Sequence, residues 1–167
     1  AHFEHTVAIT PNGPEILMEN AAGSGSTLGT TFEELAALMA VVNTPRLALC
    51  LDTCHAWAAG YDIRAPEGVK SMLDTIARTV GMQRLRCLHI SDAKGGLGSR
   101  LDRHEHIGRG HLGAAGFRAF FSDQRLWQLP AILETPRDLP DDEHNDLQCA
   151  INLAAASGGP ITPLTLN

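Results

Sequence analysis

Four short apolar segments of the sequence each end at, or next to, a side chain that can bind a metal ion. These side chains are Glu19, Asp52, His89 and Glu134. A single carboxylate after a strand is more often a helix cap or a turn residue. Metal-binding side chains at all four strand ends are much harder to obtain by chance. Ligands of parallel α/β folds lie at the carboxyl ends of the strands, and mixed Glu, Asp and His ligands suit zinc, manganese or iron. The pattern therefore predicts a divalent-metal site.

Three further residues have the spacing of a second metal-binding group. His55 follows Asp52 by three residues, and Asp102 precedes His104 by two. Side chains two apart in an extended segment point the same way and can grip one ion. Taken singly, His55 also fits a packed loop histidine, and Asp102 and His104 also fit a solvated loop. Together with the strand ends, they indicate more than one metal ion.

Positive charge gathers in the same part of the sequence. The long Gly-rich segment 91–113 contains Lys94, Arg100, Arg103 and Arg109. Such cations beside a metal site suit an anionic substrate, especially phosphate. Plain solubility accounts for them as readily, so both interpretations stay open. The segment is too long for a simple connection, which favours a functional loop.

Strand and helix patterns alternate along the chain, and a parallel sheet is expected from that alternation. Four units are too few to close a barrel, for which eight is the common number. The α/β chain is therefore expected to form half of a (β/α)₈ barrel or a small open sheet. Strands are expected at 15–19, 46–52, 85–90 and 130–134, helices at 31–42, 66–80, around 117–121 and at 142–155, and a loop between 52 and 66.

Length and composition indicate a single globular domain over 1–167, with 156–167 as a poorly ordered tail. The 13 Lys and Arg against 19 Asp and Glu give a net charge of −6, which by itself ranks nucleic acid low as a partner. No apolar run approaches the ~20 residues of a membrane span. Since the N-terminal sequence also lacks a signal-peptide pattern, a cytoplasmic protein is expected.

Several longer motifs resemble the endonuclease IV family of xylose isomerase-like barrels. Segment 49–57 with 59–62 is similar to its DTCH segment, and 88–94 is similar to its H-x-N-D-x-K segment. Segment 98–104 with 107–110 resembles GSRxDRH and the glycine turn that follows. Segments 18–20 with 23–26, and 132–135, resemble ENTAGQGS and ILET. These motifs keep the family order from about residue 15 to 135.

The resemblance implies a barrel that uses three zinc ions to cleave DNA 5′ to abasic sites, leaving a 3′-hydroxyl. Glu19 would bridge the first and second ions and act with Glu134 as a catalytic carboxylate. Two to three ions are expected, with manganese or iron as alternatives to zinc. Three divalent ions would neutralise the charge of −6, so that charge no longer argues against DNA. Asp52, His89 and Glu134 would complete the second site, and His55, Asp102 and His104 would hold the third.

The resemblance covers only the C-terminal half of the family barrel. The first four βα units, which supply two histidines to the first metal, have no counterpart here, and neither His2 nor His5 matches their motifs. Ser91 replaces an Asn of the family pattern, which should affect only its own loop. A half barrel leaves two exposed sheet edges, so we expect self-association or a partner N-terminal half. A piece of a longer enzyme and a degenerate relative are two alternatives to such an assembly.

Two other functions are compatible with these residues. A sugar isomerase or epimerase of the same barrel group would use Glu19, Asp52, His89 and Glu134 around one metal. A non-catalytic DNA-binding remnant would keep the metals without the reaction. His55, Asp102 and His104 favour the endonuclease, because a one-metal isomerase has no use for them. Asp92 and Glu105 are the expected hydrogen-bond partners of the ligand histidines.

Overall fold

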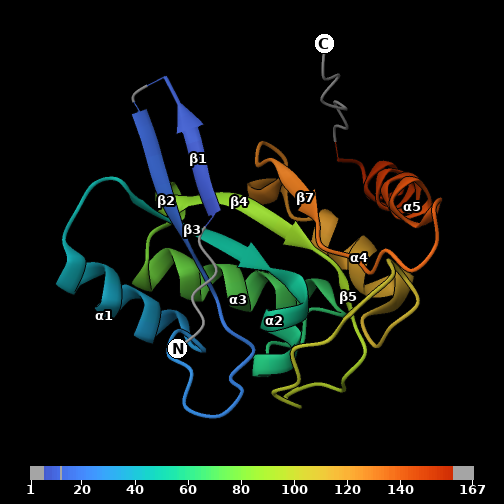
Figure 1. Cartoon of the computed structure of the whole chain (residues 1–167), viewed down its shortest axis with the longest axis horizontal. Coiled ribbons are helices and arrows are strands. Elements are labelled where there is room, and N and C mark those ends of the chain that lie inside the picture. The colour runs from blue at the N-terminus through green and yellow to red at the C-terminus, as the bar shows by residue number, and fades with distance from the viewer. Residues whose placement is uncertain (1–5, 12, 160–167) are drawn as a thin grey trace.

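A computed structural model of the chain describes residues 6–11 and 13–159. Its main sheet has five strands in the order β1-β2-β3-β4-β7, and a two-stranded sheet pairs β5 with β6 (Figure 1). Strands β2, β3, β4 and β7 are parallel, which confirms the expected half barrel. The strands are β1 (Thr6–Thr10), β2 (Gly13–Glu19), β3 (Leu47–Asp52), β4 (Leu85–Ile90), β5 (Asp92–Ala93), β6 (His104–Glu105) and β7 (Ala131–Leu133).

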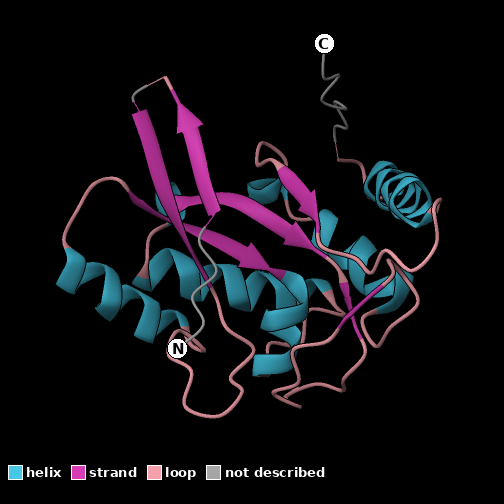
Figure 2. Ribbon diagram, in the orientation of Figure 1, coloured by secondary structure: helices cyan, strands magenta, loops and turns pink. Residues whose placement is uncertain are grey.

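The helices follow the strands in the manner of βα units. Figure 2 shows helices gathered along one side of the strands, and by the labels of Figure 1 these include α1, α2 and α3. None of the helices within the described residues is long and apolar enough to cross a membrane. They are α1 (Phe32–Val42), α2 (Thr53–Ala59), α3 (Pro66–Thr79), α4 (Gly113–Phe121) and α5 (Asp142–Ala156), with short 3₁₀ turns η1 (Met82–Arg84) and η2 (Gln124–Leu126).

Local sequence signals explain where two of the helices begin. Thr31 caps α1, since its side chain accepts from the backbone N–H of Glu34 at 3.2 Å. The Glu34 carboxylate accepts in return from the N–H of Thr30 and Thr31, at 2.9 and 3.4 Å, as a capping box does. Pro66 occupies the first turn of α3, where its missing N–H costs nothing.

The strand β1 was not expected from the sequence. It pairs antiparallel with β2, from Thr6 opposite Leu17 to Thr10 opposite Gly13. Its sequence, TVAIT, is rich in β-branched residues, and an Asn-Gly pair follows, which is a strong hairpin signal. The edge of β2 is therefore covered by β1, and the outer strands of the sheet are β1 and β7.

The helix α2 also departs from the expected loop between 52 and 66. Asp52 is its N-cap, and its carboxylate accepts from the backbone N–H of His55 at 2.7 Å. Residues Thr53 to Ala58 of α2 are buried, so the helix shows no alternation of polar and apolar positions. A helix that is buried on all sides has no amphipathic period, so the sequence did not predict it.

The two faces of β3 pack into different clusters. Leu47, Leu49 and Leu51 join the main core against the helices, where each buried leucine contributes about 1.5–3 kcal/mol. Ala48 and Cys50 point to the other face, with Leu17 and Cys87. The alternation leaves Asp52, the last residue of β3, on that second face.

The domain assignment to 1–167 and the tail at 156–167 remain predictions. Helix α5 ends at Ala156, and Ser157 closes it with a hydrogen bond from its side chain to the Leu153 carbonyl oxygen at 2.8 Å. Residues 160–167 lie outside the described residues, as do His2 and His5.

Candidate metal centre

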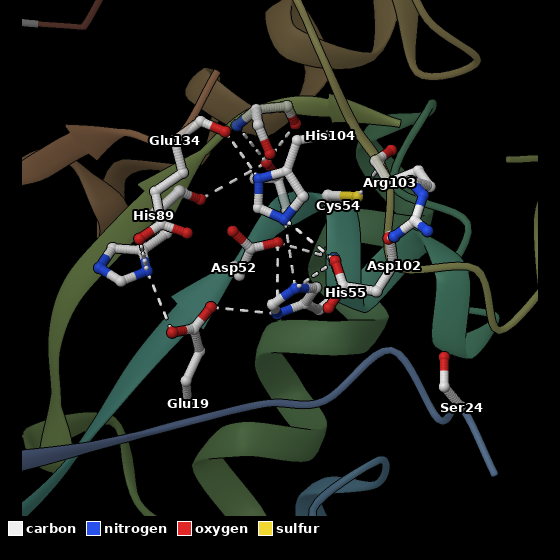
Figure 3. A network of polar contacts seen from close by, with 12 residues as sticks. Glu19, Ser24, Asp52, Cys54, His55, His89, Asp102, Arg103, His104 and Glu134 are labelled. Atoms are coloured by element: carbon white, nitrogen blue, oxygen red, sulfur yellow. Dashed lines mark hydrogen bonds and ion pairs between the residues drawn. The ribbon is translucent and has the colours of Figure 1, made fainter. Parts of the chain in front are cut away.

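Four strand ends bring their polar side chains to one place. Glu19 ends β2, Asp52 ends β3, His89 lies in β4, and Glu134 directly follows β7. Each offers a ligand atom within 4.8 Å of the others. The Nδ1 atom of His89 lies 3.1 Å from Glu19 Oε2 and 3.0 Å from Glu134 Oε1. Figure 3 shows these side chains pointing toward one another from separate elements.

Short distances in this group do not correspond to hydrogen bonds. Among the described residues, Glu19 Oε1, Asp52 Oδ2 and His89 Nδ1 are buried and have no hydrogen-bond partner. A buried polar atom without a partner costs about 1–3 kcal/mol, so three together call for a common cause. Atoms that converge without aligning suit a cation placed between them, and three carboxylates with one imidazole suit zinc or manganese. The donor set fits a divalent metal.

The second group predicted from the sequence also comes together. Asp102 Oδ1 lies 3.2 Å from His55 Nε2 and 3.3 Å from His104 Nε2, and the two Nε2 atoms are 3.3 Å apart. His104 reaches this point because β6 pairs with β5, which follows β4 directly. The three residues therefore form another candidate metal-binding group.

Backbone carbonyls hold the two imidazoles of the second group. His55 Nδ1 lies 2.9 Å from the Asn20 carbonyl oxygen, and His104 Nδ1 lies 2.6 Å from that of Glu134. An N–H donated at Nδ1 leaves Nε2 free to bind a metal, and both Nε2 atoms face Asp102. The expected partners, Asp92 and Glu105, do not fill this role.

Asp92 and Glu105 hold the polypeptide backbone instead. Asp92 is fully buried and accepts from the backbone N–H of Leu112 at 2.8 Å and of Gly113 at 3.0 Å, which fixes the start of α4. Glu105 accepts from the N–H of His106 at 2.9 Å. Their contribution to the site is the shape of the loop that carries Asp102 and His104.

Two polar residues that the sequence analysis did not assign to the site link neighbouring strand ends. Asn20 accepts from the Asp52 N–H at 2.8 Å and donates to its carbonyl oxygen at 3.1 Å. The Thr53 hydroxyl accepts from the Ser91 N–H at 3.1 Å and donates to the Ser91 carbonyl oxygen at 2.7 Å. These bonds continue the sheet beyond its last ladder pairs, so they fix the separation of the ligands. In the sequence, the only sign of this role is an amide or hydroxyl side chain directly after a strand.

Charges within the site compensate one another. Burial opposes a charged imidazole, yet the carboxylates of Glu134 and Glu19 raise the pKa of His89 to about 10. Burial also opposes a charged Glu19, but His55 and His89 lower its pKa to about 2. Burial raises the pKa of Asp52 to about 6. The carboxylates thus require positive charge between them, which protons or a metal ion can supply.

The four basic residues of the long loop are all exposed. Lys94 and Arg109 line a shallow pocket of about 240 Å³ together with Glu105, Gly110 and His111. Arg103 donates to the Asp102 carbonyl oxygen at 2.9 Å. Arg100 has a left-handed backbone with φ of +56°, and Ser24 donates to its carbonyl oxygen at 2.6 Å. That bond ties the loop after β2 to the loop between β5 and β6.

Residues 8–155 match the model of a protein family described as the xylose isomerase-like TIM barrel. The chain belongs to this family. Its relatives within that TIM-barrel family include a probable endonuclease 4 of Geobacter sulfurreducens, 50% identical over 133 residues, which are 79% of this chain and 44% of the relative. A probable endonuclease 4 of Methanoculleus marisnigri is 42% identical over 142 residues, or 84% of this chain and 50% of the relative.

Solved TIM-barrel structures agree with the sequence relatives. Endonuclease IV from Thermus thermophilus superposes with a TM-score of 0.75 at 41% identity, covering 88% of this chain and 52% of that one. A D-tagatose 3-epimerase-like protein gives a TM-score of 0.59 at 18% identity, which shows the shared fold alone. The resemblance to endonuclease IV is confirmed, and the chain spans about half the length of the curated relatives it matches.

Proposed function

We propose that this chain provides half of the active site of a zinc-dependent endonuclease, which cleaves DNA 5′ to abasic sites and leaves a 3′-hydroxyl. The observation that carries this proposal is the second donor group, since His55, Asp102 and His104 converge beside a strand-end group that would suffice for one metal. Similarity to endonuclease IV over most of the chain supports the same function.

Each donor group is assigned one ion. Glu19, Asp52, His89 and Glu134 would hold one ion, the second of the family-type cluster. Glu19 would also bridge to the first ion, whose histidines belong to the other half of the barrel. Its Oε2 lies 3.1 Å from His89 Nδ1, whereas its Oε1 is buried with no hydrogen-bond partner among the described residues. We propose zinc, with manganese or iron as alternatives that accept the same donors. His55, Asp102 and His104 would hold the third ion.

The metal would contribute Lewis acidity toward the phosphodiester and a lowered pKa for water. We assign the proton transfer to Glu134, whose side chain is 29% exposed against 8% for Glu19. A partly exposed carboxylate at the edge of the site can orient a water molecule and accept its proton. Glu19 is more enclosed, and its role would be to bind metal and hold the neighbouring ligands in position.

The exposed cations would bind the DNA backbone. Lys94 and Arg109 line the same shallow pocket, and Arg100 and Arg103 lie in the same loop as the proposed ligand Asp102. Phosphate contacts of this kind position a duplex without reading its sequence. A DNA substrate also implies a protein that works inside the cell.

The complete active site would include the other half of the barrel. By resemblance to endonuclease IV, that half supplies the two histidines of the first metal. It could belong to a longer chain, to a separate partner or to a second copy of this chain. We therefore expect weak or no incision by the described half alone and full incision once the barrel is complete.

The test is incubation with a duplex that holds one abasic site, with and without a chelator, beside the same duplex without the lesion. The chain is assayed alone and with the N-terminal half of the Thermus thermophilus enzyme. Incision on the 5′ side that the chelator abolishes, and that His104→Ala lowers while Glu67→Gln does not, supports the proposal. Absence of incision in both assemblies, with DNA binding retained, would instead favour a non-catalytic remnant.

A further inference from the structure

Cys50 and Cys87 lie directly below the strand-end metal ligands. In the register of β3 against β4, Cys50 is the partner of Cys87, and Asp52 is the partner of His89. Side chains two apart along a strand point to the same face, so the cysteines form the next layer on the face that carries Asp52 and His89. Figure 1 shows β3 and β4 as neighbours within the sheet.

The two thiols are enclosed, close together and free. Cys50 is 0% and Cys87 3% exposed, all four cysteines are free in the part of the chain that the structure describes, and Leu17 and Ala48 are buried beside them. The two sulfur atoms and a ring nitrogen of His89 lie within 4.8 Å of one another. Donors around a tetrahedral ion are separated by roughly 3.5 Å, so small side-chain rotations would bring all three onto one ion.

We propose that Cys50, Cys87 and His89 form a separate metal site for a thiophilic divalent cation such as Cd²⁺. Thiolate ligands favour soft cations, whereas the carboxylates of the layer above favour harder ones. On binding, each thiol releases its proton to solvent as its sulfur bonds to the ion, and no electron is transferred. This site goes beyond the proposed nuclease function and does not depend on it.

The shared imidazole makes the two layers compete. His89 Nδ1 lies close to Glu19 and Glu134, and a cation bound by the thiols would use the same imidazole ring. A soft cation bound by Cys50 and Cys87 therefore lowers the affinity of the strand-end carboxylates for their own ion. Thiophilic metals would therefore weaken metal binding at the strand ends, and they would act through two buried cysteines.

The number of sulfur ligands separates this site from an alternative. Cys54 lies in a group with Asp52 and His104, and its sulfur is 3.6 Å from the Arg103 carbonyl oxygen. An ion held there would have one sulfur neighbour, an ion held by Cys50 and Cys87 would have two, and an ion in the carboxylate layer would have none. Cys149 belongs to none of these groups and is half-buried in α5, so it serves as the matched control.

The experiment titrates the reduced 167-residue chain with Cd²⁺ and follows the ultraviolet charge-transfer absorption of thiolate–cadmium bonds. Cys50→Ser and Cys87→Ser should each lower the Cd²⁺ affinity by at least about 100-fold, since even indirect contacts to a ligand contribute 10–100-fold. Cys149→Ser should leave the titration unchanged. Loss of the absorption in Cys54→Ser with retention in Cys50→Ser would overturn the proposal.

A second measurement on the wild-type protein covers the case in which a variant fails to fold. X-ray absorption at the cadmium edge counts sulfur neighbours of the bound ion directly. Two sulfur neighbours support the site, and one or none overturns it. Both readouts are independent of nuclease activity, so failure of this site and failure of the proposed function are distinguishable.

Discussion

At the level of single residues, Asp52 combines two roles that looked like alternatives in the sequence. Its Oδ1 accepts from the His55 N–H and caps α2, whereas its Oδ2 is buried without a hydrogen-bond partner among the described residues. One oxygen therefore explains the local structure, and the other is left for the metal. A cap and a ligand are compatible because a carboxylate has two acceptor oxygens.

The two donor groups should respond differently to substitution. His104→Ala removes a ligand of the second group only, so the zinc content should fall by about one ion per chain. Glu19→Ala removes a carboxylate that faces both His55 and His89, and it should lower the content further. Elemental analysis after desalting measures both, with Glu67→Gln as the control on an exposed carboxylate. A wild-type content of about one ion or fewer would contradict the assignment of two groups.

Asn20 is expected to act through the backbone of Asp52. Asn20→Ala leaves the Asp52 N–H and carbonyl without their partners, which should lower the free energy of unfolding by about 1–3 kcal/mol. It should also weaken zinc binding by about 10–100-fold, as loss of a supporting contact does. Urea unfolding and zinc titration measure the two effects. Asn152→Ala, on the exposed face of α5, should change neither.

The convergence of the seven candidate ligand side chains could be predicted because each is a metal-binding side chain placed by a strand end or a short spacing. What holds them could not be predicted in the same way. The carbonyls of Asn20 and Glu134 orient the imidazoles, and every residue has a carbonyl, so the sequence carries no sign of which one is used. Asn20 and Thr53 likewise act through backbone atoms of residues distant in sequence.

At the level of elements, the sequence predicted the four parallel strands and the helices α1, α3, α4 and α5, but missed β1 and α2. Helix α2 is seven residues long and buried over nearly its whole length, so its sequence lacks the alternation that marks an amphipathic helix. Strand β1 is five residues long, and its β-branched sequence with the Asn-Gly pair that follows was a local signal for a hairpin. Tertiary contacts decide α2, whereas β1 was readable from the sequence.

A salt bridge between η2 and α3 gives the fold an acid-sensitive contact. Arg125 binds Asp123 through Nε and Nη2 at 2.9 and 2.6 Å, and it binds Asp74 of α3 through Nη1 at 2.8 Å. The Arg125 guanidinium holds the pKa of Asp123 below its usual range, although burial opposes this. A lowered pKa stabilises the folded state above the unfolded value of about 3.9, and this stabilisation is lost as the pH falls through the folded value.

Asp123→Asn should therefore lower the free energy of unfolding by about 0.5–1 kcal/mol at neutral pH, the upper range for a partly exposed pair. The difference from the wild type should shrink as the pH falls below about 4. Urea unfolding at a series of pH values measures it, and Asp141→Asn, on an exposed aspartate before α5, is the control. A difference that is constant with pH would show that the salt bridge is not the cause.

At the level of the whole molecule, the sheet is half of a barrel with unequal edges. Strand β1 covers the edge of β2, so β1 and β7 are the outer strands, each paired on one side only within the residues that the structure describes. Ala131 and Ile132 of β7 are exposed, and an exposed strand edge is a site for pairing with another chain. Because β7 ends the parallel series of the half barrel, we expect association to proceed through β7.

The chain should show a mass above that of a monomer by light scattering, rising with protein concentration. Ala131→Lys places a charge on the open edge and should shift the mass toward the monomer, because charged edge strands resist pairing. Val41→Lys adds the same charge to an exposed position of α1 and should leave the mass unchanged. A monomeric mass at every concentration would contradict pairing between copies, and it would leave β7 available only to a distinct half barrel. An equal loss of association in both variants would mean that net charge, and not the β7 edge, governs contact between the chains.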